Sequence, residues 1–308
     1  MHSIQVAAEK SGLTADVIRV WERRYQAISP ERSPSNQRVY SNDDVYRLIL
    51  LRKATESGRR ISSVANLTTE ELERIASDVD IANELASEQV TQQRLSHNYL
   101  ESSLEAIQSL DGWRLERYFQ QALVEMGLVA FLKDLIHPLL CKVGNLWQNG
   151  NIRTCQEHFA SASVRSFLGR FMVDTNTDRQ GPRIVMATPP NHAHELGATM
   201  VGVIAATRGW QVVYLGPAVP IEELVFAADC KNALAVALSI SFPVIDPQIP
   251  KYLTELRHLL PNQINILVGG ASHQSYEKTL NEINAIAVKD IDEFIAAIDK
   301  LRGPDEND

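Results

Sequence analysis

The sequence predicts a multidomain chain that combines a winged helix-turn-helix, an all-α four-helix bundle and an α/β doubly wound parallel sheet. Three observations support this fold class. A short N-terminal segment carries helix caps and turn signals, a central segment has apolar residues at helical spacing, and a C-terminal segment alternates short apolar runs with helical stretches. We place the three domains at residues 1–78, 79–178 and 181–308, in line with the two or three domains expected for 308 residues.

Composition is that of an ordinary globular protein, with 44% apolar and 22% charged residues. No apolar run reaches the roughly 18 residues of a membrane helix, and the N-terminus lacks a signal-peptide pattern. The three cysteines, Cys141, Cys155 and Cys230, are too widely spaced for a zinc motif or a disulfide framework. We therefore expect a soluble, cytoplasmic protein without a membrane partner.

Charge is divided unevenly along the chain. Residues 1–60 hold 11 Lys and Arg against 7 Asp and Glu, a balance of +4, while the remainder carries −12 of the total net charge of −8. Affinity for DNA depends on local neutralisation of phosphates and not on the charge of the whole chain. The basic N-terminal segment therefore remains a candidate for DNA binding.

The N-terminal segment reads as helix, helix, hairpin and helix. A short helix starts at Ile4 and turns at Gly12, and Thr14 is the expected N-cap of a second helix that reaches Tyr25. A turn-rich loop and a short strand follow over residues 29–40, and Ser41-Asn42-Asp43-Asp44 caps a third helix to about residue 57. This order is typical of a winged helix-turn-helix, whose second helix enters the major groove.

Arginines gather on the second helix and the hairpin. Arg19 and Arg23 are four residues apart and share one helix face. Arginine pairs with phosphates and guanine edges in a bidentate manner, and an aromatic ring packs against the sugar-phosphate backbone. A solvated basic face is the plain alternative, but the order of elements favours DNA contact. The candidate DNA-binding residues are Thr14, Arg19, Trp21, Arg23, Arg24, Tyr25, Arg32, Arg38 and Tyr40.

Residues 2–75 resemble the DNA-binding domain of MerR-family regulators. The resemblance rests on the sequence Trp-Glu-Arg-Arg-Tyr at residues 21–25 and on Arg-Val-Tyr at residues 38–40. The family often has glycine in the wing, where this chain has residues Ser35-Asn36-Gln37. The resemblance implies regulation of transcription and double-stranded operator DNA as a partner.

The central and C-terminal segments differ in periodicity. Residues 80–178 are expected to be helical, with breaks at Asp111-Gly112, His137-Pro138 and Gly150, and the polar stretch 175–182 reads as a linker. Regular strand–helix alternation then predicts a Rossmann-like sheet with its ligand at the carboxyl ends of the strands. The expected strands are 184–188, 212–215, 234–240, 264–268 and 285–288.

A histidine lies between the first predicted strand and its helix. His194 would stand at the carboxyl edge of the sheet, where a ring nitrogen can ligate a metal, although a lone histidine there is more often solvated or structural. Ser239 ends the third strand, and Gly269-Gly270 end the fourth. Together these resemble the cobalamin-binding domain of the methionine synthase and methylmalonyl-CoA mutase type, with its pattern Asp-x-His-x-x-Gly, Ser-x-Leu and Gly-Gly.

This second resemblance implies a cobalt corrinoid cofactor and a role for each matching residue. His194 corresponds to the lower axial cobalt ligand, and Gly197 to the residue that lets the nucleotide tail enter. Two positions depart from the pattern, because His192 replaces the aspartate that orients the ligand and Ser241 replaces the leucine. The residues assigned to the cofactor tail and its surroundings are His192, Gly197, Ser239, Ser241, Gly269 and Gly270.

Trp147 is followed ten residues later by Glu157-His158 in the helical segment. A core tryptophan beside a surface charge pair is the plain alternative, but the set and the three-domain order resemble CarH-type light-responsive regulators. The resemblance implies adenosylcobalamin bound in the dark, with Trp147 against the adenosyl group and with Glu157 and His158 holding it. It also implies self-association into dimers and tetramers on DNA, which light reverses by cleaving the cobalt–carbon bond.

The leading hypothesis is therefore a light-responsive repressor that uses adenosylcobalamin. His192, Ser241 and Gln148, which stands where caps of this type can carry a second histidine, keep open a regulator without light sensing. Such a regulator would respond to cobalamin or another tetrapyrrole, or to no ligand. A corrinoid carrier subunit of a methyltransferase is a third alternative. No Ser/His/Asp set, phosphate loop or paired-carboxylate site emerges, so no enzyme activity is expected.

Overall fold

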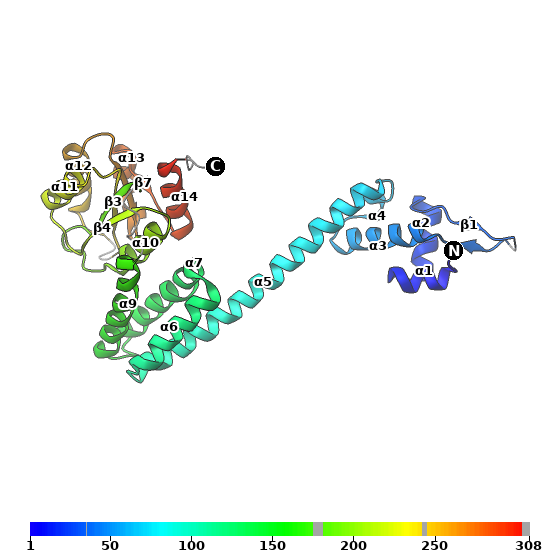
Figure 1. Cartoon of the computed structure of the whole chain (residues 1–308), viewed down its shortest axis with the longest axis horizontal. Helices are drawn as coiled ribbons and strands as arrows, with labels where there is room; N and C mark the ends of the chain where they lie inside the picture. The colour runs from blue at the N-terminus through cyan, green and yellow to red at the C-terminus, as the bar shows by residue number, and fades with distance from the viewer. Residues whose placement is uncertain (35, 175–180, 242–244, 304–308) are drawn as a thin grey trace. The chain divides into compact units, whose positions relative to one another are not determined.

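The computed structural model describes residues 1–34, 36–174, 181–241 and 245–303, with the backbone alone for 81–89, 173 and 174. The chain forms two compact units, Met1–Gln92 and Gln93–Asp308 (Figure 1). Across the described residues, none of the helices combines the length and the apolar character needed to span a membrane.

The first unit has the predicted winged helix-turn-helix order. The Thr14 hydroxyl accepts a hydrogen bond from the Val17 amide at 3.3 Å, and Ser41 and Asp44 form a reciprocal capping box, so both predicted helix starts are confirmed. Gly12, at φ +69°, ends the first helix as expected. The elements are α1 (Ile4–Ser11), α2 (Ala15–Tyr25), β1 (Glu31–Arg32), β2 (Arg38–Val39), α3 (Asn42–Glu56) and α4 (Ile61–Val64).

Helix α5 (Thr69–Gln108) runs through the predicted domain boundary at residues 78 and 79. The division into three domains therefore stays a prediction, whereas the three predicted architectures are present. The other bundle elements are α6 (Gly112–Met126), α7 (Leu128–Ala130), η1 (Phe131–Ile136), α8 (His137–Gln148) and α9 (Thr154–Asp174). The predicted linker at residues 175–182 lies largely outside the described residues.

Two of the predicted helix breaks are confirmed and one is wrong. The chain turns at Asp111-Gly112 and at Gly150, but His137-Pro138 does not interrupt the helix. The π-helical segment η1 runs directly into α8, and Pro138 lies in the first turn of α8. A proline is tolerated there because the wider π turn and the helix start leave its missing N–H unused. A break that was not predicted occurs at Gly127, at φ +75°.

The C-terminal part of the second unit is the predicted Rossmann-like sheet. Five parallel strands pair in the order β4-β3-β5-β6-β7. The strands are β3 (Arg183–Ala187), β4 (Gln211–Gly216), β5 (Ala235–Ser239), β6 (Asn265–Gly269) and β7 (Ile286–Ala287). The helices are α10 (Leu196–Thr207), α11 (Ile221–Cys230), α12 (Ile249–Leu259), η2 (His273–Tyr276), α13 (Glu277–Glu282) and α14 (Ile291–Arg302).

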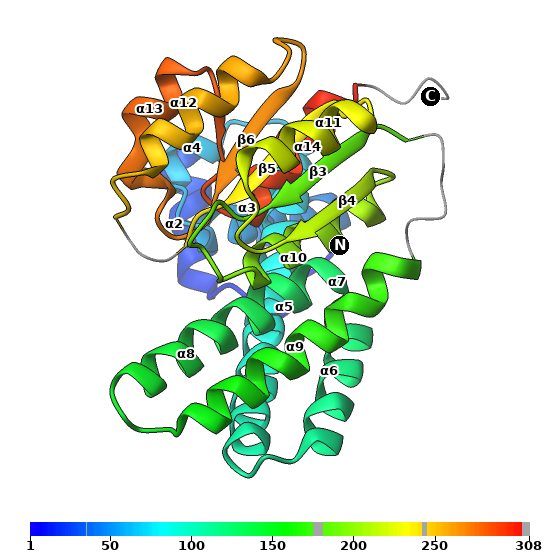
Figure 2. The same cartoon turned by 90° about the vertical axis from the view of Figure 1, so that its left-hand side faces the viewer.

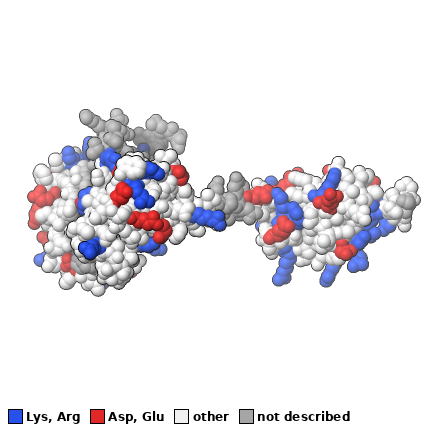
Figure 3. Space-filling view, turned by 90° about the horizontal axis from the view of Figure 1, so that it is seen from below, with Lys and Arg blue, Asp and Glu red and all other residues white. Residues whose placement is uncertain are grey.

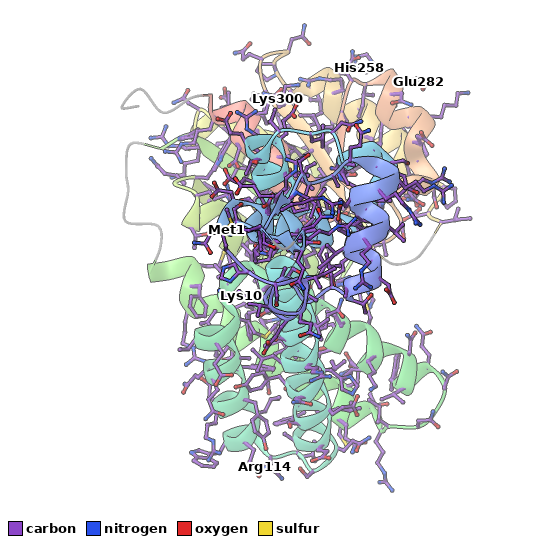
Figure 4. The ribbon with its side chains drawn as sticks, turned by 90° about the vertical axis from the view of Figure 1, so that its right-hand side faces the viewer. Met1, Lys10, Arg114, His258, Glu282 and Lys300 are labelled. Carbon is purple, nitrogen blue, oxygen red and sulfur yellow. The ribbon has the colours of Figure 1, made fainter. Side chains whose placement is uncertain are left out.

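Alternate strand residues face two apolar cores. Ile184 and Met186 belong to a core shared with α10, α14 and the bundle, whereas Val185 and Ala187 belong to the core under α11, α12 and α13. Figure 2 shows the bundle helices α8 and α9 adjoining the sheet domain beside α10. The start of α6, marked by Arg114, lies at the bundle end remote from the sheet (Figure 4). The bundle and the sheet thus share one continuous core.

We expect Phe167→Ala to destabilise this shared core by about 3–5 kcal/mol, the usual cost of truncating a buried phenylalanine. The Phe167 ring is buried and packs against Phe119 and Phe131, with ring centroids 5.3 and 5.5 Å away. Denaturant unfolding measures the change in the free energy of unfolding. Val124→Ala is the control, because the exposed Val124 side chain should contribute within about 0.5 kcal/mol. Equal unfolding midpoints for the two variants would contradict the assigned core.

Candidate functional site

Helix α2 presents a row of arginines on its outer face. Arg19, Arg23 and Arg24 are exposed, and the visible surface of residues 1–92 shows projecting Lys and Arg side chains with acidic residues between them (Figure 3). An Arg19 Nη1 atom lies 2.7 Å from Asp16 Oδ1, and the Arg24 guanidinium lies 5.8 Å from the centre of the Tyr25 ring. These side chains remain candidates for phosphate or base contacts.

The wing is tied to α2 by an ion pair. Arg38 Nε donates to both carboxylate oxygens of Glu22, at 2.8 and 2.9 Å, and this hydrogen bond raises the pKa of Arg38. Within the hairpin, Arg32 Nη1 donates to the carbonyl and side-chain oxygens of Asn36, at 3.2 and 3.0 Å. Two predicted DNA contacts therefore also set the shape of the wing.

Three predicted DNA contacts have structural roles in this unit. Trp21 and Tyr40 are buried in the core of the unit, so neither ring can reach DNA in this conformation, and burial raises the pKa of Tyr40. Thr14 caps α2. Because both side chains pack inward, Trp21 and Tyr40 stabilise the core of this unit in place of the predicted DNA contact.

A cavity of about 510 Å³ lies where the carboxyl ends of β5 and β6 meet the bundle. Four residues predicted for the cofactor tail line it together: Gly197, Ser239, Gly269 and Gly270. Lys133, His137 and Cys141, one helical turn apart along η1 and α8, line it from the bundle. The bundle and the sheet domain, the two layers of the second unit, thus both contribute walls to the cavity.

The glycines of the cavity are required by close approaches. A Cβ atom at Gly197 would lie 3.2 Å from Ser239 Oγ, and one at Gly269 would lie 3.1 Å from the carbonyl oxygen of Val288. At Gly270, φ is +95° and a Cβ atom would lie 2.6 Å from the carbonyl oxygen of Ile240. The volume is within the roughly 300–1,000 Å³ of small-molecule sites, and apolar walls with few polar groups suit a nucleotide tail. The residues therefore fit the tail of a corrinoid.

The loop between β3 and α10 carries both histidines of the predicted motif. His194 is exposed and lies outside the cavity lining, so its ring is accessible to a metal from solvent. His192 is buried, with its Nε2 atom 3.6 Å from Asp246 Oδ2, and its carbonyl accepts a hydrogen bond from the Thr188 hydroxyl. His192 therefore holds the loop from inside, while His194 faces outward.

Ser241 lies just beyond the end of β5. Its carbonyl oxygen accepts a hydrogen bond of 2.7 Å from the Ser272 hydroxyl. Among the described residues, Ser241 is not part of the cavity lining, unlike Ser239. The structure thus gives Ser241 a backbone contact and leaves its predicted cofactor contact as a prediction.

Trp147, Glu157 and His158, the residues predicted to contact the adenosyl group, lie around the turn between α8 and α9. Trp147 is partly exposed and donates from Nε1 to Thr154 Oγ1 at 3.2 Å. His158 Nδ1 lies 2.7 Å from Glu157 Oε2, and the Ser161 hydroxyl donates to the other oxygen of Glu157 at 2.7 Å. Trp147 is ten residues beyond His137, about 15 Å along α8. Glu157 and His158 contact each other, as in the plain alternative of a surface charge pair. Among the described residues, neither they nor Trp147 line the cavity, and their contact with the adenosyl group stays a prediction.

Two features of this region escaped the sequence prediction. Arg165 of α9 donates from Nε to Glu195 Oε1 at 2.7 Å, and the Tyr214 hydroxyl donates to Glu195 Oε2 at 2.8 Å. Burial raises the pKa of Tyr214. Residue spacing does not predict a contact between residues 30 apart in different elements. The available sequence signal was the position of Glu195 directly after His194.

The second feature is the pair formed by Cys141 and His137 in the cavity wall. Cys141 Sγ lies 3.7 Å from His137 Nε2. This hydrogen bond lowers the pKa of the Cys141 thiol and raises the pKa of the His137 imidazole. The i, i+4 spacing was visible in the sequence, but a thiol and an imidazole four residues apart have many orientations in a helix.

Comparison with known proteins matches each part of the chain. Residues 2–71 match the MerR HTH family of regulatory proteins, and residues 99–171 and 182–298 each match a B12 binding domain. The HTH-type transcriptional repressor CarH of Myxococcus xanthus is 31% identical over 278 residues, 90% of this chain and 91% of the relative. The repressor CarA of the same organism is 27% identical over 302 residues, 97% and 96% of the two chains.

A solved structure shares the fold of the second unit. The monomethylamine corrinoid protein of Methanosarcina barkeri superimposes with a TM-score of 0.55 at 15% identity, covering 66% of this chain and 98% of that protein. At this identity the likeness concerns the arrangement of helices and strands alone.

We expect Cys141 to react with a thiol probe such as iodoacetamide faster than Cys155 at neutral pH. The lowered thiol pKa leaves more thiolate at a given pH, and the thiolate is the nucleophile. His137→Gln removes the hydrogen bond, so the pKa rises and the rate at pH 7 falls several-fold, whereas the rates converge above pH 9. Peptide mass spectrometry over a pH series measures each cysteine separately. A Cys141 rate that is unchanged in His137→Gln at pH 7 would contradict this pairing.

Proposed function

The chain belongs to the family of MerR-type transcriptional regulators with B12-binding domains, and on this premise we propose that it is a light-responsive repressor. It binds adenosylcobalamin in the dark, assembles into a DNA-bound oligomer and releases its operator on illumination. The observation that supports this most is the cavity whose walls come from both the sheet and the bundle. A ligand held there contacts both layers and can therefore change how they pack.

We assign each part of the cofactor to residues of the second unit. His194 would supply a ring nitrogen to the cobalt, while Ser239 and the two glycines at the end of β6 would hold the nucleotide tail. The bound cofactor supplies a cobalt–carbon bond that light cleaves. Trp147, Glu157 and His158 would hold the adenosyl group, with the Glu157 carboxylate oriented by Ser161. These assignments rest on the family pattern and on the cavity.

The first unit would carry the operator contacts. Arg23 and Arg24 on α2 and Arg32 on the wing are exposed, and Arg38 fixes the wing to Glu22. Each copy presents one recognition helix, so an assembly of copies places several on DNA. A ligand that favours one packing of the second unit shifts the population between assembled and separate copies. The repressor function follows from that shift.

A regulator without light sensing is the second candidate. Gln148 follows Trp147, and the buried His192 beside Asp246 replaces the carboxylate of the cobalamin pattern. Such a regulator would bind cobalamin and DNA in the same way but would respond to the presence of the ligand. The corrinoid-carrier alternative has the fold likeness in its favour, whereas the curated relatives that span the chain are repressors.

The deciding experiment uses purified protein with adenosylcobalamin in darkness and after green light. We expect a dark complex that elutes as an oligomer and binds operator DNA, and loss of both after illumination. The His194→Ala variant should lose the absorption signature of histidine-ligated cobalt while its circular dichroism is unchanged, since His194 is exposed. Assembly that ignores light but follows cobalamin addition supports the second candidate. Absence of corrinoid binding by the wild-type protein contradicts the light-responsive repressor and leaves, of the second candidate, a regulator that responds to another tetrapyrrole or to no ligand.

We expect Arg23→Ala to weaken operator binding by about 1–3 kcal/mol if the side chain reads a base, with the cofactor spectrum unchanged. Arg23 lies on the outer face of α2, far in sequence from every residue of the cavity. Titration of labelled operator at several salt concentrations measures the loss and separates base reading from phosphate contact. A loss that is equal for specific and random DNA, with a smaller salt slope, would assign Arg23 to phosphate contact instead.

A further inference from the structure

Two polar contacts lie on one face of α9, one at Glu157 and one beside the loop of His194. Glu157, Ser161 and Arg165 are spaced by four residues and therefore share one face of the helix. Ser161 contacts the Glu157 carboxylate, and Arg165 contacts Glu195, the residue directly after His194. Eight residues of helix separate Glu157 from Arg165, about 12 Å. The residues proposed for the two faces of the cofactor are thus joined by a single helix and one ion pair.

Glu195 is fixed from several sides. Its carboxylate is only 12% exposed and accepts hydrogen bonds from Arg165 Nε at 2.7 Å and from the Tyr214 hydroxyl at 2.8 Å. Its carbonyl oxygen accepts a hydrogen bond from the Thr199 amide at 2.9 Å, in the first turn of α10. The Thr199 hydroxyl lies 3.2 Å from the Tyr214 hydroxyl. Glu195 is therefore held to the sheet domain by β4 and α10 and to the bundle by α9.

We propose that Glu195 is a positioning residue that couples the bundle helix α9 to the loop carrying His194. The carboxylate bridges the two layers through Arg165 and Tyr214, so a displacement of α9 is transmitted to the backbone next to His194. The inference rests on the proposed function for its consequence and on the contacts above for its geometry. Through Arg165 and Glu195, cobalt ligation by His194 would depend on which group is held near Trp147, Glu157 and His158.

The coupling has a physical basis in the burial of the carboxylate. A mostly buried carboxylate needs its donors, because an unpaired buried charge is costly. If α9 moves away, Glu195 loses Arg165 and keeps one neutral donor, so the loop must rearrange or Glu195 must turn toward water. Either response alters the orientation of the adjacent residue, His194. An exposed ion pair without this burial would transmit little.

The structure provides a matched control on the same helix. Arg170 of α9 also pairs with a glutamate, Glu116 of α6, at 2.6 Å, and its side chain is 53% exposed against 52% for Arg165. The partner of Arg170 belongs to the bundle, whereas the partner of Arg165 belongs to the loop. Arg170→Gln therefore removes an ion pair of the same kind, with a more exposed glutamate, and leaves the contact between the bundle and the loop intact.

The first test needs no cofactor. Hydrogen exchange of the backbone amides at residues 191–196 is measured in the wild-type protein and in Arg165→Gln, Glu195→Gln and Arg170→Gln. We expect exchange in this segment to be several-fold faster in the first two variants and unchanged in Arg170→Gln. The double variant Arg165→Gln/Glu195→Gln should exchange no faster than either single variant, because both remove one interaction. Equal acceleration in Arg170→Gln, no acceleration, or additive effects would overturn the coupling.

The second test uses adenosylcobalamin and hydroxocobalamin in darkness, with affinity and absorption spectrum as readouts. We expect Arg165→Gln to keep the absorption spectrum of histidine-ligated cobalt. The ratio of its affinities for adenosylcobalamin and hydroxocobalamin should be closer to one than the wild-type ratio, by a factor of at least about ten. Arg165→Lys should restore part of the wild-type ratio, since an ammonium can still reach Glu195. An unchanged ratio overturns the proposal. If the wild-type protein binds no corrinoid, the proposed function fails and the exchange measurement alone decides the coupling.

Discussion

One apolar core runs from the helical bundle into the sheet domain, and the positions of the other features follow from it. Phe167 of α9 and Val203 of α10 belong to the same cluster of buried side chains. Because protein interiors are packed to crystal-like density, the two layers cannot slide past each other without opening voids. A gap in the packing lies where η1 and α8 pass the ends of β5 and β6, and there the cavity forms. A ligand in that gap completes or distorts the packing of both layers.

Ion pairs at the edges of this core set the register of the layers without supplying much stability. Lys133 of η1 pairs with Asp292 of α14, and Arg165 of α9 pairs with Glu195. The Lys133–Asp292 pair is partly exposed on both sides and is worth about 0–1 kcal/mol, so a ligand can displace it at small cost. The Glu195 side chain is mostly buried, so the loss of Arg165 costs more. The apolar core keeps the layers together while these pairs select one arrangement among close alternatives. A protein whose packing responds to a ligand needs both an apolar core that holds the bundle to the sheet and edge contacts that the ligand can break.

Features that depend on residues close together in the sequence were predicted correctly, whereas contacts between residues far apart in the sequence were missed. The caps at Thr14 and Ser41 and the alternation of strands and helices depend on residues within one turn or one strand, and they are confirmed. The cavity glycines were predicted because a family pattern records their close approaches. The ion pair of Arg165 with Glu195 and the continuous passage through Pro138 depend on tertiary packing, which residue spacing does not encode. Trp21 was assigned to DNA because aromatic chemistry alone does not distinguish the inner face of α2 from its outer face.

The division of charge explains why control of assembly would suffice to control DNA occupancy. The remainder of the chain carries a net charge of −12, so the DNA contacts are expected in the basic first 60 residues, which match the MerR HTH family. Some of that positive charge is already engaged there, as Arg38 is by Glu22 and Arg19 by Asp16. One such module would bind phosphates through the cations that remain, and linked modules gain affinity through their effective concentration. In the proposed function, a ligand that alters packing around the cavity would act through the association of copies, and the DNA-contact residues can stay as they are.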